Sequence, residues 1–225
     1  LENRALKLVD KLPGKNPNES NGFECLEEKL QPLLELSQNN YESYHNFHYC
    51  WLITGSLINS EELKDRLNEE SLEKLLNRLD SCARATAKLY GGQRVEGDES
   101  ALHLCMRSND CSKQHLLVCL MLTYSLQQLV KQLSSRSSIK IEMTWILLGK
   151  KIASTPIFSF HEDMAQLKKS SLDQAAKLKN EMIAIQTSEF SIDELSTIAR
   201  FNHLEESYFS LKAFPIERQE LLNRQ

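Results

Sequence analysis

Two histidines and two cysteines fall within thirteen positions of the chain, in the stretch HLCMRSNDCSKQH. They are His103, Cys105, Cys111 and His115. Imidazole and thiolate groups are the ligands that a structural zinc ion prefers, and such a site needs four of them in a tetrahedral arrangement. The first question that this sequence raises is therefore whether the stretch holds a metal.

The spacing of Cys105, Cys111 and His115 resembles the second half of a CCCH zinc finger. That family needs another cysteine upstream, where this chain has RVEG at residues 94–97. His103 would have to replace the missing thiolate, and the apolar run that follows the stretch indicates a long helix rather than a small loop-rich module. We therefore expect no metal here, and we interpret the four side chains as parts of a helix-turn-helix.

A second set of candidate ligands begins at His45 and His48, which are three positions apart and would share one face of a helix. A catalytic metal needs at least one more protein ligand and an open position. His161 with Glu162 or Asp163 supplies suitable types, but no ordered spacing connects the two groups, and HEDMA lacks the second histidine of an HExxH motif. A metal-dependent hydrolase of helical type that uses His45, His48 and His161 stays as an alternative.

Other signatures of enzymes or of nucleic-acid binding are weak in the sequence. No GxGxxG motif follows a strand pattern, and the glycines at 91–97 come without the lysine and hydroxyl residue of a phosphate-binding loop. A net charge of -4 provides no overall field for a polyanion. Lysines cluster at 168–179, but acidic neighbours dilute them, so a nucleic-acid-binding helical domain is a weaker alternative. We expect no enzymatic activity and no cofactor.

Aromatic side chains are concentrated in the stretch YESYHNFHYCWLITGSL, which we predict to be helical over 41–59. Tyr41, Tyr44, His48 and Trp51 align at helical spacing. Because tyrosine and tryptophan are enriched at interface hot spots, this line is predicted to receive a protein partner. The alternative is that the whole aromatic set lies in a helical core.

The first twelve residues, LENRALKLVDKL, place Leu1, Leu8, Val9 and Leu12 near one face of an amphipathic helix. A polar tether follows at 13–22, and residues 23–225 are predicted to form a single all-helical domain with an internal loop at 91–98. A helix of this length is marginal in water on its own. We therefore expect it to dock into a groove of the main body, either in the same chain or on a neighbouring copy.

Seven glycines and five prolines leave long stretches without a break, which favours helices. Residues 61–90 are predicted to form a short helix and a long one that restarts after Asn68. Two capping boxes, Ser159 to Glu162 and Ser191 to Glu194, predict helices that end near residues 185 and 212. Residue ranges 24–38, from about 99, and 110–133 are also predicted to be helical, with a last short helix after Pro215.

The stretch IKIEMTWILLGKKIA, residues 139–153, allows two interpretations. Its isoleucines alternate with lysine and glutamate as in a strand, but the longer period of Ile141, Trp145, Leu148 and Ile152 favours a helix. The whole pattern therefore predicts an all-α fold of about nine to ten helices. It would be either a compact multi-helix bundle or an irregular, HEAT-like helical-repeat array.

The predicted function follows from the lack of catalytic motifs. We expect a non-enzymatic scaffold of a complex, which binds a helical or extended segment of a partner protein in a groove between helices. The six cysteines are expected to be reduced thiols of an intracellular protein, cytoplasmic or nuclear. No secretory signal is seen and no apolar run is long enough for a membrane span, so no membrane association is expected, whereas a homo-oligomer stays open.

Overall fold

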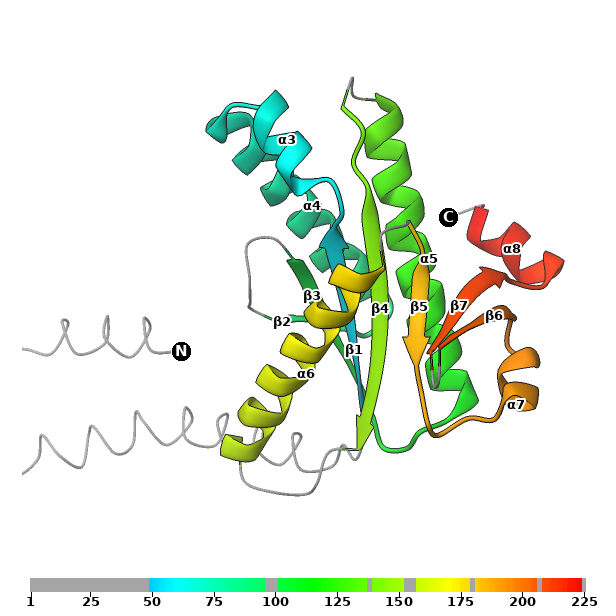
Figure 1. Cartoon of the computed structure of the whole chain (residues 1–225). Coiled ribbons are helices and arrows are strands. Elements are labelled where there is room, and N and C mark those ends of the chain that lie inside the picture. Colours follow the sequence, from blue (N-terminus) through cyan, green and yellow to red (C-terminus); the bar gives the residue numbers. More distant parts are fainter. Residues whose placement is uncertain are drawn as a thin grey trace, which may run out of the picture. The chain divides into compact units, whose positions relative to one another are not determined.

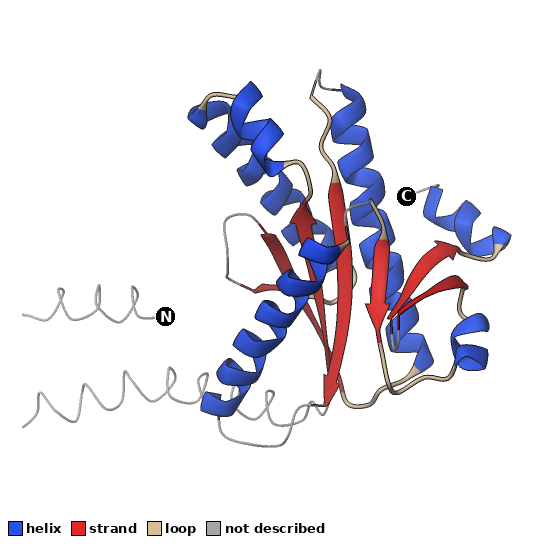
Figure 2. Cartoon of the chain, in the orientation of Figure 1, coloured by secondary structure: helices blue, strands red, loops and turns tan. Residues whose placement is uncertain are grey.

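The computed structural model describes residues 49–95, 101–136, 139–151, 157–178, 181–205 and 208–223, which belong to one unit of the chain. Within them the backbone forms a seven-stranded mixed sheet with helices on both faces (Figure 1). Figure 2 shows how strands and helices alternate along the chain. The predicted all-α fold, whether a bundle or a helical repeat, is therefore wrong.

The strands follow the order β2-β3-β1-β4-β5-β7-β6 across the sheet. Their bounds are β1 Tyr49–Leu57, β2 Gln93–Val95, β3 Ala101–Ser108, β4 Met143–Lys151, β5 Ile183–Gln186, β6 Arg200–Glu205 and β7 Tyr208–Ala213. The helices are α3 Ser60–Arg66, α4 Glu69–Leu89, α5 Lys113–Arg136, α6 Ile157–Lys177, α7 Ile192–Ser196 and α8 Ile216–Asn223. β4 and β5 are parallel, and the other neighbouring strands are antiparallel.

β1 occupies the middle of the sheet and is antiparallel to both β3 and β4. Its side chains alternate between two separate hydrophobic clusters. Trp51 and Ile53 belong to the larger cluster, which includes residues of α4 and α5. Cys50 and Leu52 belong to a smaller cluster on the α6 side. Because both faces are covered, the strand is apolar almost throughout and shows none of the polar alternation of a half-exposed strand.

Two crossover connections build the layers on either side of the sheet. α5 leads from β3 to β4, the two strands that flank β1, and α6 leads from β4 to the parallel strand β5. In Figure 1, α6 lies in front of the sheet while α4 and α5 lie behind it. By length and composition α5 could cross a membrane, a test that buried core helices also pass. Here Leu116, Leu120 and Leu122 of α5 are fully buried within the larger cluster.

Five of the predicted helices contain strands in the structure. The predicted helix over 41–59 contains β1, the one from about 99 contains β3, and the one over 139–153 contains β4. The helix predicted to end near 185 ends at Lys177 and is followed by β5, and the one predicted over 191–212 ends at Ser196 and is followed by β6 and β7. For 139–153 the alternative that the sequence left open, a strand, is the observed one. In β1 and β4, β-branched and aromatic residues are buried on a pleated surface, and that packing outweighs the apparent helical period.

Three of the predicted helix starts that rest on local chemistry are confirmed, whereas the capping box predicted at Ser159 is wrong, because α6 begins before it at Ile157. Asn68 caps α4, since its side chain accepts a hydrogen bond of 2.8 Å from the amide of Ser71. Ser191 and Glu194 form both hydrogen bonds of a capping box at the start of α7. α8 begins directly after Pro215. Such local hydrogen bonds depend on adjacent residues alone, so the sequence predicts them well.

Several predictions lie outside the described residues. They include the amphipathic segment 1–12 with its docking residues, the tether 13–22, and the predicted helix over 24–38. The division of the chain into these segments and one domain over 23–225 therefore stays a prediction.

Gly55 of β1 allows a test of the close contact between β1 and β4. It pairs with Trp145, and a Cβ atom at Gly55 would come within 2.5 Å of the Trp145 ring. Because the indole is fully buried, we expect Gly55→Ala to lower the free energy of unfolding by about 1 to 3 kcal/mol, the usual cost of overpacking. Urea denaturation followed by far-ultraviolet circular dichroism measures the change.

The matched control is Ser56→Ala in the same strand, where the side chain is half-buried. This variant should stay within about 0.5 kcal/mol of the parent. Equal stability of the two variants would show that Trp145 does not lie across Gly55.

Candidate functional site

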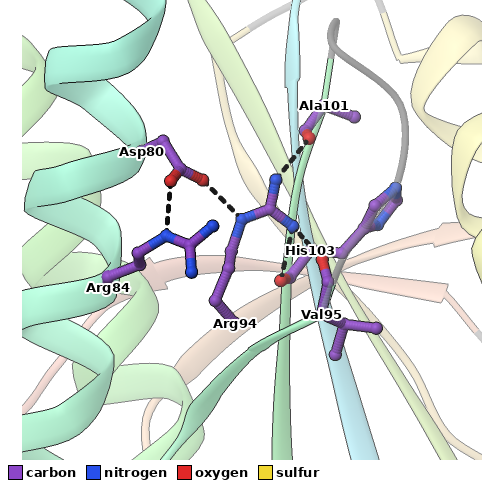
Figure 3. Close-up of polar contacts among 6 residues, drawn as sticks. All are labelled: Asp80, Arg84, Arg94, Val95, Ala101 and His103. Atoms are coloured by element: carbon purple, nitrogen blue, oxygen red, sulfur yellow. Dashed lines mark hydrogen bonds and ion pairs between the residues drawn. The ribbon is translucent and has the colours of Figure 1, made fainter. Parts of the chain in front are cut away.

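The candidate site lies where α4 meets the β2–β3 edge of the sheet, and its central group is the Arg94 guanidinium. Arg94 Nε lies 2.6 Å from Asp80 Oδ1, and its side chain is only 10% exposed. Its Nη1 donates to the carbonyl oxygens of Val95 and, at 3.0 Å, His103, while Nη2 donates to Ala101 at 3.3 Å. Figure 3 shows Arg94 between the α4 carboxylate and these carbonyl groups.

These bonds join the two strands of the β2–β3 hairpin to one helix. Val95 ends β2 and Ala101 begins β3, so Arg94 holds both described ends of the connection between them. A planar guanidinium can serve a carboxylate and several carbonyl groups at once because its five N–H donors point in fixed directions. Arg94 therefore fixes the position of this hairpin against α4.

Asp80 is the acceptor that holds the Arg94 side chain in place. It also accepts from Arg84 Nε at 2.5 Å, one helical turn along α4. Burial opposes ionisation of Asp80, but the hydrogen bonds from Arg84 and Arg94 outweigh it and lower the pKa of the carboxyl group. Asp80 is therefore an anion at neutral pH and forms an ion pair with Arg94 of the hairpin.

A cavity of about 540 Å³ adjoins Arg94 and Asp80 on the α4 side of the sheet. Part of its wall is apolar. Leu57, Leu102 and Met143 of the sheet and Leu79 of α4 line this part. Glu69 and Glu73 of α4 add carboxylates at its edge. The volume falls in the range of small-molecule sites.

A second polar group is buried on the opposite face of the sheet, under α6. Thr54 of β1 lies 3.0 Å from His103 Nδ1 and 2.8 Å from the hydroxyl of Ser171, measured from Thr54 Oγ1. All three side chains are essentially inaccessible to solvent. Such a network links β1, β3 and α6 through hydrogen bonds in a water-free layer, where each bond is strong.

The donors in this network follow from counting hydrogens. The Ser171 hydroxyl donates its single hydrogen to the Lys168 carbonyl oxygen at 2.7 Å. Thr54 must then donate to Ser171, and its oxygen is left to accept from His103. His103 Nδ1 therefore carries a hydrogen. The arrangement orients His103, and burial keeps it away from any solvent-borne substrate.

Three of the four residues of the zinc hypothesis lie on opposite faces of the sheet, and the fourth, His115, is half-buried on α5. His103 and Cys105 of β3 face α6, where His103 meets Thr54 and Cys105 packs within the smaller cluster. Cys111 packs against the larger cluster on the other face. Across the described ranges, no three His, Cys, Asp or Glu side chains form a group that could hold a metal ion. The expectation of no zinc stays a prediction.

The other predicted site residues are not brought together in the described part of the chain. Trp51 is fully buried and its ring lies 5.6 Å from that of Tyr49, so it belongs to the core. Tyr41, Tyr44, His45 and His48 lie outside the described residues, as do the side chains at 161 and 162. Asp163 pairs with Lys150 at 2.5 Å.

A scan against protein-family models finds no match for the chain, and a search of curated proteins finds none either. Solved structures do match. A double mutant of the guanylyl cyclase domain of the RhoGC fusion protein from the aquatic fungus Blastocladiella emersonii, in monomeric form, is 12% identical, with a TM-score of 0.58 over 76% of this chain and 97% of that one. A non-canonical dimeric form of the domain gives 12% identity and a TM-score of 0.56, over 75% and 98%.

Two further structures extend the likeness to other organisms. The adenylyl cyclase CyaB from P. aeruginosa is 11% identical, with a TM-score of 0.54 over 75% of this chain and 96% of that one. The guanylate cyclase domain of RhGC from Catenaria anguillulae, solved in complex with GTP, is 12% identical, with a TM-score of 0.54 over 75% and 98%. At these identities the likeness shows the fold, which is that of guanylyl and adenylyl cyclase domains.

The comparisons correct the predicted function. The prediction of a non-enzymatic scaffold with a groove between helices is wrong, because the described residues form a mixed sheet with the fold of cyclase domains and not an array of helices. The same likeness contradicts the expectation that the protein is not an enzyme. It gives no support to the helical metal-dependent hydrolase or to the nucleic-acid-binding domain. The dimeric form of one neighbour keeps a homo-oligomer open for this chain.

The sequence did not reveal the residues that the structure brings together. Asp80 and Arg84 are four positions apart on a predicted helix, a spacing that indicates an ion pair. Arg94, however, reaches Asp80 from another element, and only the glycines before it mark a change of direction in the chain. A strand assignment for 93–95 and 101–108 would have identified Arg94 as a hairpin residue.

The bonds of Arg94 predict the effect of its removal. We expect Arg94→Ala to lower the free energy of unfolding by about 1 to 3 kcal/mol, because partly buried carbonyl groups lose their donor. Arg94→Lys should recover little of this loss, since an ammonium group lacks the planar fork. Urea denaturation at pH 7 measures both variants.

Arg84→Ala is the control, because the Arg84 side chain is 57% exposed and its pair with Asp80 should contribute less than about 1 kcal/mol. The pKa of Asp80 is lowered in the folded protein, so its contribution is present above the pKa of the unfolded chain and is lost as the pH falls through the folded value. The difference in the free energy of unfolding between Arg94→Ala and the parent should therefore become smaller at acid pH. An equal difference at pH 7 and at acid pH would contradict the role of Asp80.

The buried network under α6 gives a separate prediction. Thr54→Val keeps the shape of the side chain but leaves His103 Nδ1–H without its acceptor, at a cost of about 1 to 3 kcal/mol. Thr123→Val is the matched control: Thr123 is also fully buried, but its hydroxyl bonds to the Cys119 carbonyl of its own helix. That variant should change stability by less than about 0.5 kcal/mol. Equal losses of unfolding free energy in Thr54→Val and Thr123→Val would show that the hydrogen bond between Thr54 and His103 adds nothing to stability.

Proposed function

We propose that the chain is a nucleotide cyclase domain, which binds a purine nucleoside triphosphate and converts it to the cyclic monophosphate and pyrophosphate. One observation carries the proposal. The likeness takes in 97% and 98% of the guanylyl cyclase domains of the RhoGC protein, so it covers whole domains and is more than a shared βαβ unit. A fold can serve several activities, and for that reason the activity is proposed from these neighbours rather than read from the sheet.

The proposed reaction makes clear demands on a protein. The ribose 3′-hydroxyl group attacks the α-phosphorus, its proton is lost, and the bond from that phosphorus to the pyrophosphate oxygen breaks. Phosphoryl transfer depends mainly on positioning and on stabilisation of charge. β1, β3 and β4 offer a rigid support for this, because most of their residues are buried and hydrogen-bonded on both sides.

The cavity beside α4 does not suit the triphosphate by charge. Glu69 and Glu73 contribute carboxylates to it, and the guanidinium of Arg94 is already bonded to Asp80 and to backbone carbonyls. A polyphosphate would meet net negative charge there. We therefore place the nucleotide outside this cavity, whose size alone would have made it a candidate.

Self-association is the finer part of the proposal. One neighbour is described as a dimeric guanylyl cyclase domain and another form of it as monomeric. We propose that this chain also forms a homodimer, which sedimentation of the purified chain at several concentrations tests. A single monomeric species at every concentration would exclude it.

The direct test is to incubate the purified full chain with ATP or GTP in the presence of Mg²⁺ or Mn²⁺. Mass spectrometry of the products should show one cyclic purine nucleotide, with an equal amount of pyrophosphate. Binding of a non-hydrolysable analogue of the same nucleotide should be saturable. The absence of both cyclic product and saturable binding for either purine would contradict the proposal. Saturable binding without cyclic product would contradict the proposed catalysis and leave only nucleotide binding.

A variant that disturbs the sheet separates this activity from that of a contaminating enzyme. Gly55→Val inserts a branched side chain against the Trp145 ring and should abolish the activity. Leu89→Gln changes a side chain that is 85% exposed and should retain it. Activity that survives unchanged in Gly55→Val does not come from this protein.

A further inference from the structure

Two cysteines on neighbouring strands have their sulfur atoms in contact. Cys50 of β1 and Cys105 of β3 are 55 positions apart in the sequence, but their Sγ atoms are 3.2 Å apart. In the antiparallel register Cys50 is opposite Arg107 and Cys105 is opposite Leu52, so the two cysteines form a diagonal pair on one face. Among the five described cysteines this is the one pair in hydrogen-bond contact.

The pair is enclosed on the α6 side of the sheet. Cys50 is 0% and Cys105 2% exposed, and Met164 and Leu167 of α6 pack in the same cluster, with Val95 of β2. Cys119, by comparison, is equally buried but lies on α5 within the larger cluster. Among the described residues, the apolar side chains that pack against the pair come from one helix and one short edge strand. We expect a local displacement of α6 to admit a small molecule.

The surroundings make one of the two thiols a nucleophile. The contact between the two thiols and the nearby Arg107 guanidinium outweigh the effect of burial and lower the pKa of Cys105 to about 7. The shift favours the Cys105 thiolate, which is the form that reacts with oxidants. Cys50 stays a thiol beside it, in position to resolve an oxidised Cys105.

We propose that Cys50 and Cys105 are a redox-sensitive pair, which a hydroperoxide converts into a disulfide between β1 and β3. The Cys105 thiolate attacks an oxygen of hydrogen peroxide, the O–O bond breaks, and the leaving hydroxide takes a proton to become water. Cys50 attacks the resulting sulfenic sulfur, the S–O bond breaks, and a second water leaves with the Cys50 proton. Two thiols lose two hydrogens and two electrons, and one peroxide becomes two waters.

The sulfur atoms must approach by about 1 Å to reach the bond length of a disulfide. Because the two residues are diagonal neighbours, β1 and β3 must also shift locally so that their Cβ atoms come within disulfide range. The product would tie the central strand to its neighbour, and a small dithiol would reverse it by exchange. This inference is independent of the proposed cyclase activity, because it concerns the reactivity of two thiols in the folded chain.

The experiment treats the full chain with hydrogen peroxide, blocks the remaining thiols, and maps disulfides in proteolytic peptides by mass spectrometry. We expect a cross-linked peptide that joins Cys50 to Cys105, loss of two thiols per chain, and recovery of both with dithiothreitol. The rate should rise about tenfold from pH 6 to pH 8 as Cys105 ionises. Mapping of the parent chain needs no substitution and therefore does not depend on the folding of a variant.

Three variants make the test specific. In Cys50→Ser, Cys105 should be trapped as a sulfenic acid by dimedone, because the resolving thiol is absent. In Cys105→Ser, Cys50 should react at least about tenfold more slowly. Cys119→Ser, the matched buried control, should form the Cys50–Cys105 cross-link at the parent rate. A peroxide-treated folded chain in which both thiols stay free, or in which Cys50 reacts equally fast without Cys105, overturns the proposal.

Discussion

The fold depends on the burial of β1 on both of its faces. Seven of its nine residues are buried, and the strand pairs along its whole length with β3 on one side and β4 on the other. The backbone N–H and C=O groups of such a strand must form hydrogen bonds to a neighbouring strand on each side. Its side chains must be covered by a hydrophobic layer on each face of the sheet. The crossover helices provide those layers, α5 with α4 on one face and α6 on the other.

Two of the buried contacts involve this strand directly. Thr54 occupies the α6 face of β1 and orients His103 of β3. Arg94 of β2 instead bonds to carbonyl groups of β3 and to Asp80 of α4. Cys50 lies four residues before Thr54 on the same face of β1, and its sulfur atom contacts the sulfur of Cys105. The Thr54–His103 and Cys50–Cys105 contacts require β1 and β3 to keep their register, since a slip by one residue would move these side chains to the other layer.

The sequence predicted those parts of the fold that depend on adjacent residues. The restart at Asn68, the capping box at Ser191 and the short helix after Pro215 are all observed, because each rests on hydrogen bonds or a fixed backbone angle within one turn. The central strands were mistaken for helices because two-sided burial removes the alternation that identifies a strand. The bonds of Thr54 join residues 49 and 117 positions apart, and no spacing rule predicts such contacts.

The central position of β1 can be measured directly by amide hydrogen exchange of the full chain under native conditions. An interior strand with both faces covered should open only in global unfolding, whereas an edge strand exchanges through local opening. We predict that amides of residues 50–54 exchange in the slowest class, together with those of 146–148, and much more slowly than those of 200–204 in the edge strand β6. Exchange of 50–54 at the rate of 200–204 would contradict this description of the sheet and, with it, the likeness to cyclase domains.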